Sequence, residues 1–349
     1  MRLRNIMTEV KEQYLEKLKS LYLKKGWSEK STQKVVAYAE NLLSLGLPVI
    51  MSRKHLSRLL GVPESYLCYM LRNIETNFYH VMHIPKKSGG EREIQAPAME
   101  LKQIQKWILK NVLEQLPVSE YAMGFRKDKS IVTNAEQHKG KHCVVNMDLK
   151  DFFPSIDRDR VFRIFYYYGY STEVSYVLSR LCTCKDKMPQ GAPTSPYLSN
   201  VVCLRLDKRL GHLAEKFHAQ YSRYADDITF SADSDIKTIV KPAEGIIGDE
   251  GFTVNEKKTR IAYNYERQEV TGIVVNGDCV TVPKGYRKKL LQEIYYCKKY
   301  GVYDHCKHIG NEKMFFREHM YGKAYFVYMV DPALGSEILQ KLGEIDWDS

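Results

Sequence analysis

The sequence predicts an α+β fold in which helical segments at both ends of the chain flank an antiparallel sheet. Residues 1–79 and 284–323 mix basic and apolar side chains at helix-like spacing. Between them, residues 143–147 form a short apolar run, and residues 221–231 form two such runs around a tight turn. We therefore expect strands of one sheet in the central part of the chain and helices at its ends.

The composition is that of a folded protein. Apolar residues make up 44% of the 349 residues and charged residues 27%, which argues against a disordered or fibrous chain. No apolar run reaches the ~18 residues of a membrane span, and residues 1–30 lack the continuous apolar stretch of a secretory signal. The eight cysteines include no CxxC pair, which argues against a zinc site or a disulfide framework. We expect a cytoplasmic protein without a membrane partner.

The charge is unevenly distributed. The net charge is +11, and most of the excess lies in residues 1–50 and 277–330. Basic ends around a near-neutral middle predict a polyanionic partner such as nucleic acid. A merely solvated basic face would give the same pattern, so charge alone does not decide between them.

The N-terminal 79 residues are expected to form a helical extension. Residues 54–71 (KHLSRLLGVPESYLCYML) contain two short helical patterns around Gly61 and Pro63, the outline of a helix-turn-helix. The alternative is an ordinary helical hairpin that packs on its neighbour.

A β-hairpin is predicted next. Residues 79–97 alternate in strand fashion on either side of Ser-Gly-Gly at 88–90. Lys86, Lys87 and Arg92 lie near its tip, where they could bind a triphosphate or simply keep the tip soluble. A helix with an apolar stripe is expected from about residue 99.

Three aspartates follow apolar strands, where burial should exclude charge. Asp148 ends CVVNMD, and Asp226 with Asp227 occupies the expected turn of YSRYADDITF. Two aspartates in a turn are common on solvated surfaces, but strands of high β-propensity on both sides would hold this turn rigidly. We expect all three carboxylates to converge.

Such a cluster needs a cation. At about 4 Å and an effective dielectric of about 20, each pair of like charges costs about 4 kcal/mol. Carboxylate oxygens without histidine or cysteine partners favour Mg²⁺. Two such ions support phosphoryl or nucleotidyl transfer, so the sequence predicts two Mg²⁺ ions, with Mn²⁺ as a possible substitute.

The order of motifs resembles that of the reverse transcriptases over about residues 80–345. Five strings carry the resemblance: NMDLKDFFPSI (146–156), MPQGAPTSPYLSN (188–200), YADD (224–227), GFTVNEKKT (251–259) and VTGIVVN (270–276). The resemblance implies a right-hand polymerase, with fingers and palm in residues 80–276, a helical thumb in 277–349 and the extension in 1–79. It also implies RNA-directed DNA synthesis from deoxynucleoside triphosphates.

The resemblance assigns roles to single residues. Asp148, Asp226 and Asp227 match the catalytic, metal-binding aspartates. Lys258 matches a lysine proposed to protonate pyrophosphate, although Lys257 beside it leaves the register open. The basic residues at the hairpin tip match the triphosphate clamp.

Two further matches concern the incoming nucleotide. Phe153 matches the steric gate that leaves no room for a ribose 2′-hydroxyl, and Phe152 is the alternative. Gln190 and Gly191 match the motif that packs against nucleotide and template, where glycine permits close backbone approach.

Shorter strings resemble one branch, the bacterial retron reverse transcriptases: NAEQH (134–138), QGAPTSP (190–196) and VTG (270–272). This resemblance implies a structured non-coding RNA as partner, priming from the 2′-hydroxyl of a guanosine, and a branched RNA–DNA product that stays bound. It also implies anti-phage defence together with an effector protein encoded nearby.

Two further groups of residues are candidate RNA contacts. Asn134 and His138 share one helical face and could bind RNA or brace the first catalytic motif. Arg287, Lys288 and Lys289 lie among tyrosines, a mixture suited to a nucleic-acid backbone.

The alternative functions are a group II intron-like or untemplated polymerase, and an RNA-binding scaffold that restrains an effector.

Overall fold

The computed structural model describes residues 2–85, 89–310 and 315–347, and of residues 2–8 only the backbone. The chain forms two compact units, each built from two stretches of sequence. The first unit contains residues 1–119 and 151–205, and the second contains residues 120–150 and 206–349. The functional division that we expect at residues 79 and 276 stays a prediction.

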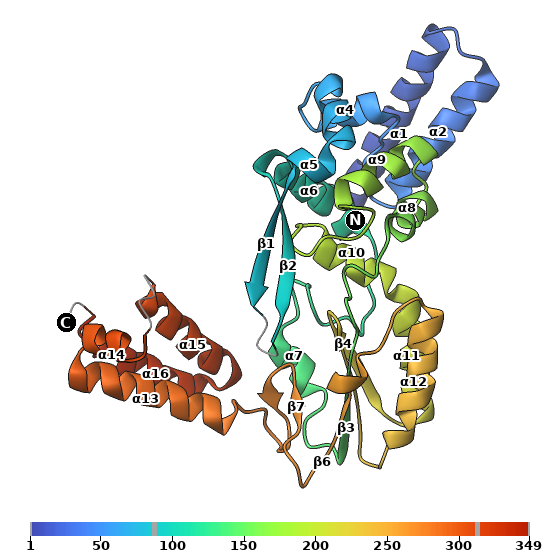
Figure 1. Cartoon of the computed structure of the whole chain (residues 1–349). Helices are drawn as coiled ribbons and strands as arrows, with labels where there is room; N and C mark the ends of the chain where they lie inside the picture. The colour runs from blue at the N-terminus through green and yellow to red at the C-terminus, as the bar shows by residue number, and fades with distance from the viewer. Residues whose placement is uncertain (1, 86–88, 311–314, 348–349) are drawn as a thin grey trace. The chain divides into compact units, whose positions relative to one another are not determined.

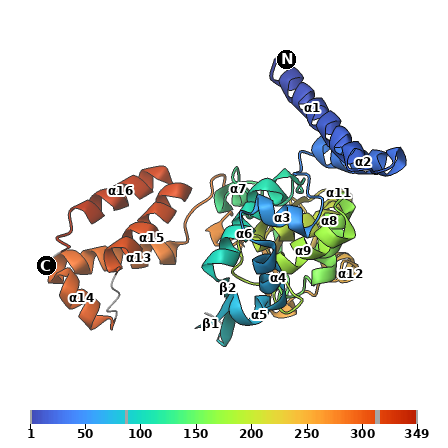
Figure 2. The same cartoon turned by 90° about the horizontal axis from the view of Figure 1, so that it is seen from above.

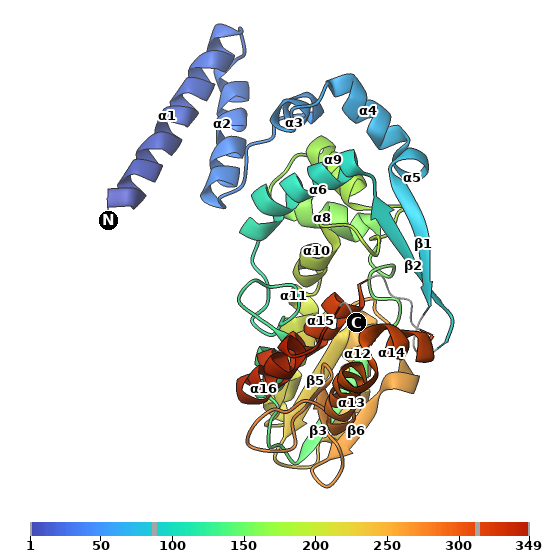
Figure 3. The ribbon, with the colours of Figure 1, turned by 90° about the vertical axis from the view of Figure 1, so that its left-hand side faces the viewer.

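The first unit begins with a pair of antiparallel helices, α1 (Arg2–Lys24) and α2 (Glu29–Ser44), which lie side by side in Figure 3. Ser28 caps α2 by accepting a hydrogen bond from the Ser31 amide. The two short helices expected around Gly61 and Pro63 are confirmed as α3 (Arg53–Leu59) and α4 (Glu64–Arg72). They pack on each other and on α9, as an ordinary helical hairpin would.

The predicted β-hairpin is confirmed in the same unit. Strands β1 (Tyr79–Pro85) and β2 (Glu91–Pro97) pair antiparallel along their whole length. The helix expected to follow is α6, whose apolar stripe is buried. The remaining helices of this unit are α5 (Ile74–Asn77), α6 (Met99–Asn111), η1 (Leu113–Gln115), α8 (Arg158–Tyr167), α9 (Thr172–Cys182) and α10 (Ser195–Val202).

The second unit is built on a four-stranded antiparallel sheet with the order β4-β5-β3-β6. The strands are β3 (Cys143–Asp148), β4 (Gln220–Tyr224), β5 (Asp227–Ala232) and β6 (Arg260–Tyr263). Helices α11 (Leu204–Lys216) and α12 (Val240–Asp249) lie along the sheet (Figure 1). Strand β3 pairs with β5 along its whole length and with β6 over residues 143–146, and all of its residues except Asn146 are buried.

A hydrophobic core supports the C-terminal helices of this unit. They are α13 (Lys284–Tyr300), α14 (Val302–His308), α15 (Phe316–Val330) and α16 (Pro332–Gly343). The expected helical region 284–323 is interrupted after α13 because Gly301 has a φ of +82°. Helices α13, α15 and α16 pack side by side (Figure 2).

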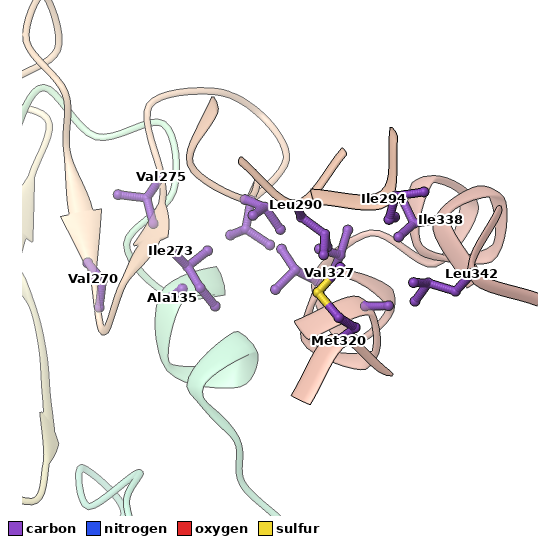
Figure 4. Close-up of a cluster of buried hydrophobic side chains, with 14 of the residues drawn as sticks. Ala135, Val270, Ile273, Val275, Leu290, Ile294, Met320, Val327, Ile338 and Leu342 are labelled. Atoms are coloured by element: carbon purple, nitrogen blue, oxygen red, sulfur yellow. The ribbon is translucent and has the colours of Figure 1, made fainter. Parts of the chain in front are cut away.

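The same core extends beyond these helices to α7 (Ile131–Glu136) and to the short β7–β8 pair (Glu269–Val270 and Ile273–Val274). Figure 4 labels ten of its members, namely Ala135, Val270, Ile273, Val275, Leu290, Ile294, Met320, Val327, Ile338 and Leu342. None of the helices formed by the described residues is long and apolar enough to cross a membrane.

Candidate active site

The pairing of β3 with β5 brings the three aspartates to one end of the sheet. Asp148, the last residue of β3, lies directly opposite Asp227, the first residue of β5. The backbone amide of Leu149 donates to the carbonyl oxygen of Asp226 over 3.0 Å. Backbone pairing therefore fixes the relative position of two segments that are far apart in sequence.

The turn between β4 and β5 differs by one residue from our expectation. It consists of Ala225 and Asp226, because Tyr224 and Asp227 form the last pair of the two strands. Ala225 has a φ of +58°, which is uncommon for a residue with a side chain. A Cβ atom on Gly124 would lie 2.9 Å from the Ala225 nitrogen, so glycine lets a neighbouring segment pack directly on the turn.

A buried ion pair holds this turn. Asp207 in α11 receives two hydrogen bonds from the Arg223 guanidinium, each 2.7 Å long, and both side chains are 0% exposed. The third contact of Arg223 runs from Nη1 to the carbonyl oxygen of Ala225 over 3.0 Å. The Tyr221 hydroxyl also donates to Asp207. A bidentate, fully enclosed pair thus fixes the backbone that carries Asp226.

Sequence reasoning missed this pair, although a signal was present. Asp207 lies between Leu206 and Leu210 on the buried face of α11, where a carboxylate needs a partner. Arg223 lies in β4 directly after the buried residues Tyr221 and Ser222 and is buried itself. Each residue breaks the pattern of its element, and two such breaks of opposite charge predict a pair.

The Asp148 carboxylate is oriented by residues of the 251–259 string. Asn255 donates from Nδ2 to Oδ1 over 3.1 Å, and its backbone amide donates to the Asp148 carbonyl oxygen over 2.7 Å. The Lys258 ammonium donates to Oδ2 over 2.9 Å, and this bond is the main reason that the pKa of Lys258 is raised. Between the two lysines that the sequence left open, the structure brings Lys258 to Asp148.

Negative charge remains in excess at this end of the sheet. Asp227 keeps solvent access at its strand end, yet partial desolvation, followed by the charges of Asp226 and Asp148, raises its pKa to about 6. In the described ranges, no group of three or more histidine, cysteine, aspartate or glutamate side chains is arranged as a ready-made metal site. The donor set is nevertheless all carboxylate, and the charges of Asp226 and Asp148 add to the desolvation that raises the pKa of Asp227. Carboxylate oxygens that repel one another fit a hard divalent cation.

The candidate nucleotide-binding side chains belong to the first unit. Phe152 is buried, whereas Phe153 is partly exposed, and their ring centroids lie 5.3 Å apart. Arg92 is exposed on β2, opposite Ile84. Lys86 and Lys87 lie outside the described residues.

Gln190 and Gly191 pack against the β-hairpin within the first unit. The Gln95 amide donates to the Gln190 carbonyl oxygen over 2.9 Å. Gly191 has a φ of +134°, and a Cβ atom there would lie 2.9 Å from the Gln95 carbonyl oxygen. Only glycine permits this approach without a backbone shift.

His138 and Asn134 join a buried polar network in the second unit. His138 lies 2.7 Å from Ser231 Oγ through Nδ1 and 2.7 Å from Ser222 Oγ through Nε2, and Ser222 donates to Asn134 Oδ1 over 2.6 Å. Because Ser222 uses its proton on Asn134, the histidine proton belongs on Nε2 and Nδ1 accepts from Ser231. Burial, with a smaller effect of Lys141, lowers the pKa of His138 to about 3, so the ring is neutral.

This network favours one of the two roles that the sequence left open for Asn134 and His138. Their exposed fractions are 1% and 0%, and the bracing alternative accounts for their bonds, whereas RNA contact stays a prediction. Asn134 also approaches Thr271, with 3.5 Å between Nδ2 and Oγ1. The NAEQH and VTG strings, far apart in sequence, therefore meet inside the protein.

The three predicted thumb cations, unlike Asn134 and His138, lie on the surface. Arg287, Lys288 and Lys289 are all exposed near the start of α13. Their position permits contact with a polyanion, and their role in RNA binding stays a prediction.

Comparison with known proteins gives matches over most of the chain. Residues 84–282 match the family model described as "Reverse transcriptase (RNA-dependent DNA polymerase)". The chain is 36% identical to the retron Ec86 reverse transcriptase of Escherichia coli, over 76% of this chain and 85% of that protein. It is also 36% identical to the retron Mx162 reverse transcriptase of Myxococcus xanthus, over 86% of this chain and 68% of that protein.

Among solved structures, the chain is similar to telomerase from Candida albicans in complex with a fragment of telomeric RNA. The TM-score is 0.43 and the identity is 11%, over 82% of this chain and 67% of that one.

Proposed function

The chain belongs to the reverse transcriptases, in their retron branch, and is an RNA-directed DNA polymerase; we propose that it copies part of a structured non-coding RNA into DNA by two-metal nucleotidyl transfer. Its fold is the right-hand polymerase that the sequence predicted. An RNA template and deoxynucleoside triphosphates are its substrates.

The observation that carries the mechanism is the pairing of Asp148 with Asp227, which places Asp226 in the adjoining turn. These three carboxylates would hold two Mg²⁺ ions, or Mn²⁺ in their place. When bound, such ions activate the attacking hydroxyl and stabilise the departing pyrophosphate. Asn255 orients Asp148 for this task, and the Arg223–Asp207 pair holds the turn.

Lys258 is proposed as the proton donor to the pyrophosphate leaving group. Its hydrogen bond to Asp148 raises its pKa, so its Nζ remains protonated at neutral pH. Its side chain is 55% exposed and therefore accessible to a substrate. Nζ therefore carries the proton that a general acid needs, within hydrogen-bond distance of a catalytic carboxylate.

Phe153 is proposed as the steric gate against ribonucleotides. Phe152 is buried in the first unit, whereas the partial exposure of Phe153 leaves its ring accessible to a sugar. Gln190 and Gly191 would contact the base pair, and Arg92 with Lys86 or Lys87 would bind the triphosphate. These roles rest on the family motifs.

The biological role is proposed from the resemblance to retron reverse transcriptases. We propose priming from the 2′-hydroxyl of a guanosine, a branched RNA–DNA product that stays bound, and anti-phage defence with an effector protein encoded nearby. The proposed location is the cytoplasm, where the transcript and the nucleotides occur. Arg287, Lys288 and Lys289 would follow the RNA backbone.

Nucleic acid that copurifies with the protein provides the test. Sequencing should find DNA complementary to one RNA, joined to it by a 2′,5′ linkage. Random DNA would instead favour untemplated synthesis, and unbranched products would favour a group II intron-like reaction.

A paired variant separates the enzyme from an RNA-binding scaffold. Asp226→Asn with Asp227→Asn should abolish both the DNA product and phage protection while RNA binding persists. Asp233→Asn, at an exposed aspartate that pairs with Lys141, is the matched control and should keep both. Protection that survives without DNA product would establish the scaffold instead.

A further inference from the structure

The N-terminal extension carries an open groove that the polymerase motifs do not use. It is formed by one face of α1 with the residue after it and by residues 51–58, most of which belong to α3, and its volume is about 660 Å³. That volume falls within the range of about 300–1,000 Å³ typical of ligand sites. The extension therefore contains a concave surface large enough to hold part of a partner.

The lining of this groove is positively charged. Lys17 contributes from α1 and Lys25 from the residue that follows this helix, and Lys54 and Arg58 contribute from α3. No aspartate or glutamate is among the lining residues, and none of these four cations forms an ion pair with a residue that the structure describes. All four are exposed. Uncompensated positive charge in a concave surface attracts a polyanion.

The groove also contains aromatic rings and a neutral hydrogen-bond donor, the His55 ring. Tyr14 is 37% exposed, and Tyr22 stands edge-on to Trp27 with ring centroids 4.9 Å apart. His55 accepts the Met51 amide at Nδ1, so the proton of the neutral ring lies on Nε2.

Tyrosine rings next to cations favour a polyanion that has unpaired bases. The spacing of Tyr14, Lys17 and Tyr22 puts them on one face of α1, and Lys25, directly after the helix, lines the same groove. Unpaired bases can stack on such rings while the phosphates contact the cations, whereas a duplex keeps its bases inside. A membrane-surface helix would need a broad free apolar face, but α1 is packed against α2.

We propose that this groove binds a single-stranded segment of RNA, separately from the polymerase active site. The choice of RNA rests on the proposed function, whereas the groove itself is a site beyond it. The N-terminal extension would thereby hold the RNA partner while the catalytic aspartates act on another part of it.

Salt-dependent binding tests the proposal. The full chain is titrated with fluorescently labelled oligouridylate, and anisotropy is measured over a range of KCl concentrations. Lys17→Gln with Arg58→Gln removes one cation from each wall. We expect Kd at low salt to rise at least about tenfold and the slope of log K against log salt to fall by about 1.4, about 0.7 per lost phosphate contact.

The matched control neutralises two cations of α1 that do not line the groove, Lys19→Gln with Lys24→Gln. Its Kd should stay within about threefold of the parent value. If both double variants lose the same affinity for oligouridylate and keep their melting temperatures, binding depends on overall charge and not on the groove, and the proposal is overturned. An unchanged Kd in the groove variant would overturn it as well.

A third variant tests the aromatic contact. Tyr14→Leu should weaken oligouridylate binding at least about fivefold and leave the salt slope unchanged, because stacking is lost while the phosphate contacts remain. An unchanged Kd would remove single-strand recognition from the proposal. If the groove variants lose binding to phosphatidylserine vesicles and keep RNA binding, the site is a membrane contact and the proposal fails.

Primer extension on a generic RNA template separates this proposal from the proposed function. All groove variants should extend the primer at the parental rate, because their substitutions lie outside the catalytic motifs. A parent chain without extension activity would refute the proposed function, while the binding results would still decide the fate of the groove.

Discussion

Two groups of charged side chains in the second unit differ in how completely they are neutralised. Asp207 and Arg223 form a bidentate pair from which solvent is excluded. At the end of β3, by contrast, Asp148 meets the half-exposed Lys258 while the pKa of Asp227 remains raised. The enclosed pair fixes the backbone, and the open group keeps negative charge available for a cation. The structural pair is thus fully neutralised, whereas the reactive group of aspartates is not.

The largest expected effect comes from removing charge at the open group. Asp227→Asn should lower the rate of nucleotide incorporation about 10³-fold or more, since metal-ion stabilisation of a transition state amounts to several kcal/mol. Its free energy of unfolding should not decrease, because a repulsive contact disappears. Single-turnover extension and denaturant unfolding measure the two quantities. A destabilised Asp227→Asn variant would contradict the contrast between the two groups.

The enclosed pair should respond in the opposite way. Arg223→Met leaves Asp207 buried without its cation and should lower the free energy of unfolding by about 3–5 kcal/mol. Adding Asp207→Leu should restore most of that loss, as measured by urea denaturation of the four members of the double-mutant cycle.

Activity of the double variant sharpens this prediction. Because it still lacks the hydrogen bond to the Ala225 carbonyl oxygen, we expect kcat to stay reduced while KM for the nucleotide is nearly unchanged. Full recovery of kcat together with stability would mean that the pair contributes to folding alone.

The neutral network around His138 should give an intermediate effect. His138→Ala removes the partner of Ser222 and Ser231 and should cost about 1–3 kcal/mol of unfolding free energy. It should impair extension on the cognate RNA and on a generic primer equally. A loss confined to the cognate RNA would restore the RNA-contact hypothesis.

The pH dependence of stability gives an independent readout for His138. Its folded pKa of about 3 is below the ordinary value of 6.5, so the unfolded chain binds the proton first as the pH falls. The stabilisation is complete above pH 6.5 and is lost as the pH falls toward 3. His138→Ala should flatten this dependence in urea unfolding, and an unchanged dependence would contradict the neutral, buried state of the ring.

The smallest effect is expected at Asn255. Asn255→Ala removes one hydrogen bond from Asp148 while Lys258 stays in place. A bond of about 1 kcal/mol predicts a decrease of about threefold to tenfold in kcat. KM for the nucleotide should be unchanged, and a change confined to KM would place Asn255 in substrate binding instead.

Some of this arrangement was predictable from local pattern. The β-hairpin, the two helices around Gly61 and Pro63, and the strands that end at the aspartates all follow from alternation and turn residues. The position of the turn was off by one residue, because Ala225 adopts a positive φ that its residue type does not indicate.

What local pattern could not supply is the direction of polar side chains. The spacing of Asn134 and His138 gave their shared face, but only Ser222 and Ser231, from strands far along the chain, make that face an internal one. The Arg223–Asp207 pair was missed for the same reason, since each partner depends on a tertiary contact.

The order of the strands has a consequence for the newly made chain. Strand β3 lies between β5 and β6, yet both neighbours follow it by many tens of residues. At about 5–20 residues per second, translation leaves both edges of this apolar strand unpaired for on the order of ten seconds. Unpaired strand edges invite aggregation, so the segment that ends in Asp148 is the one that a nascent-chain chaperone would most need to cover.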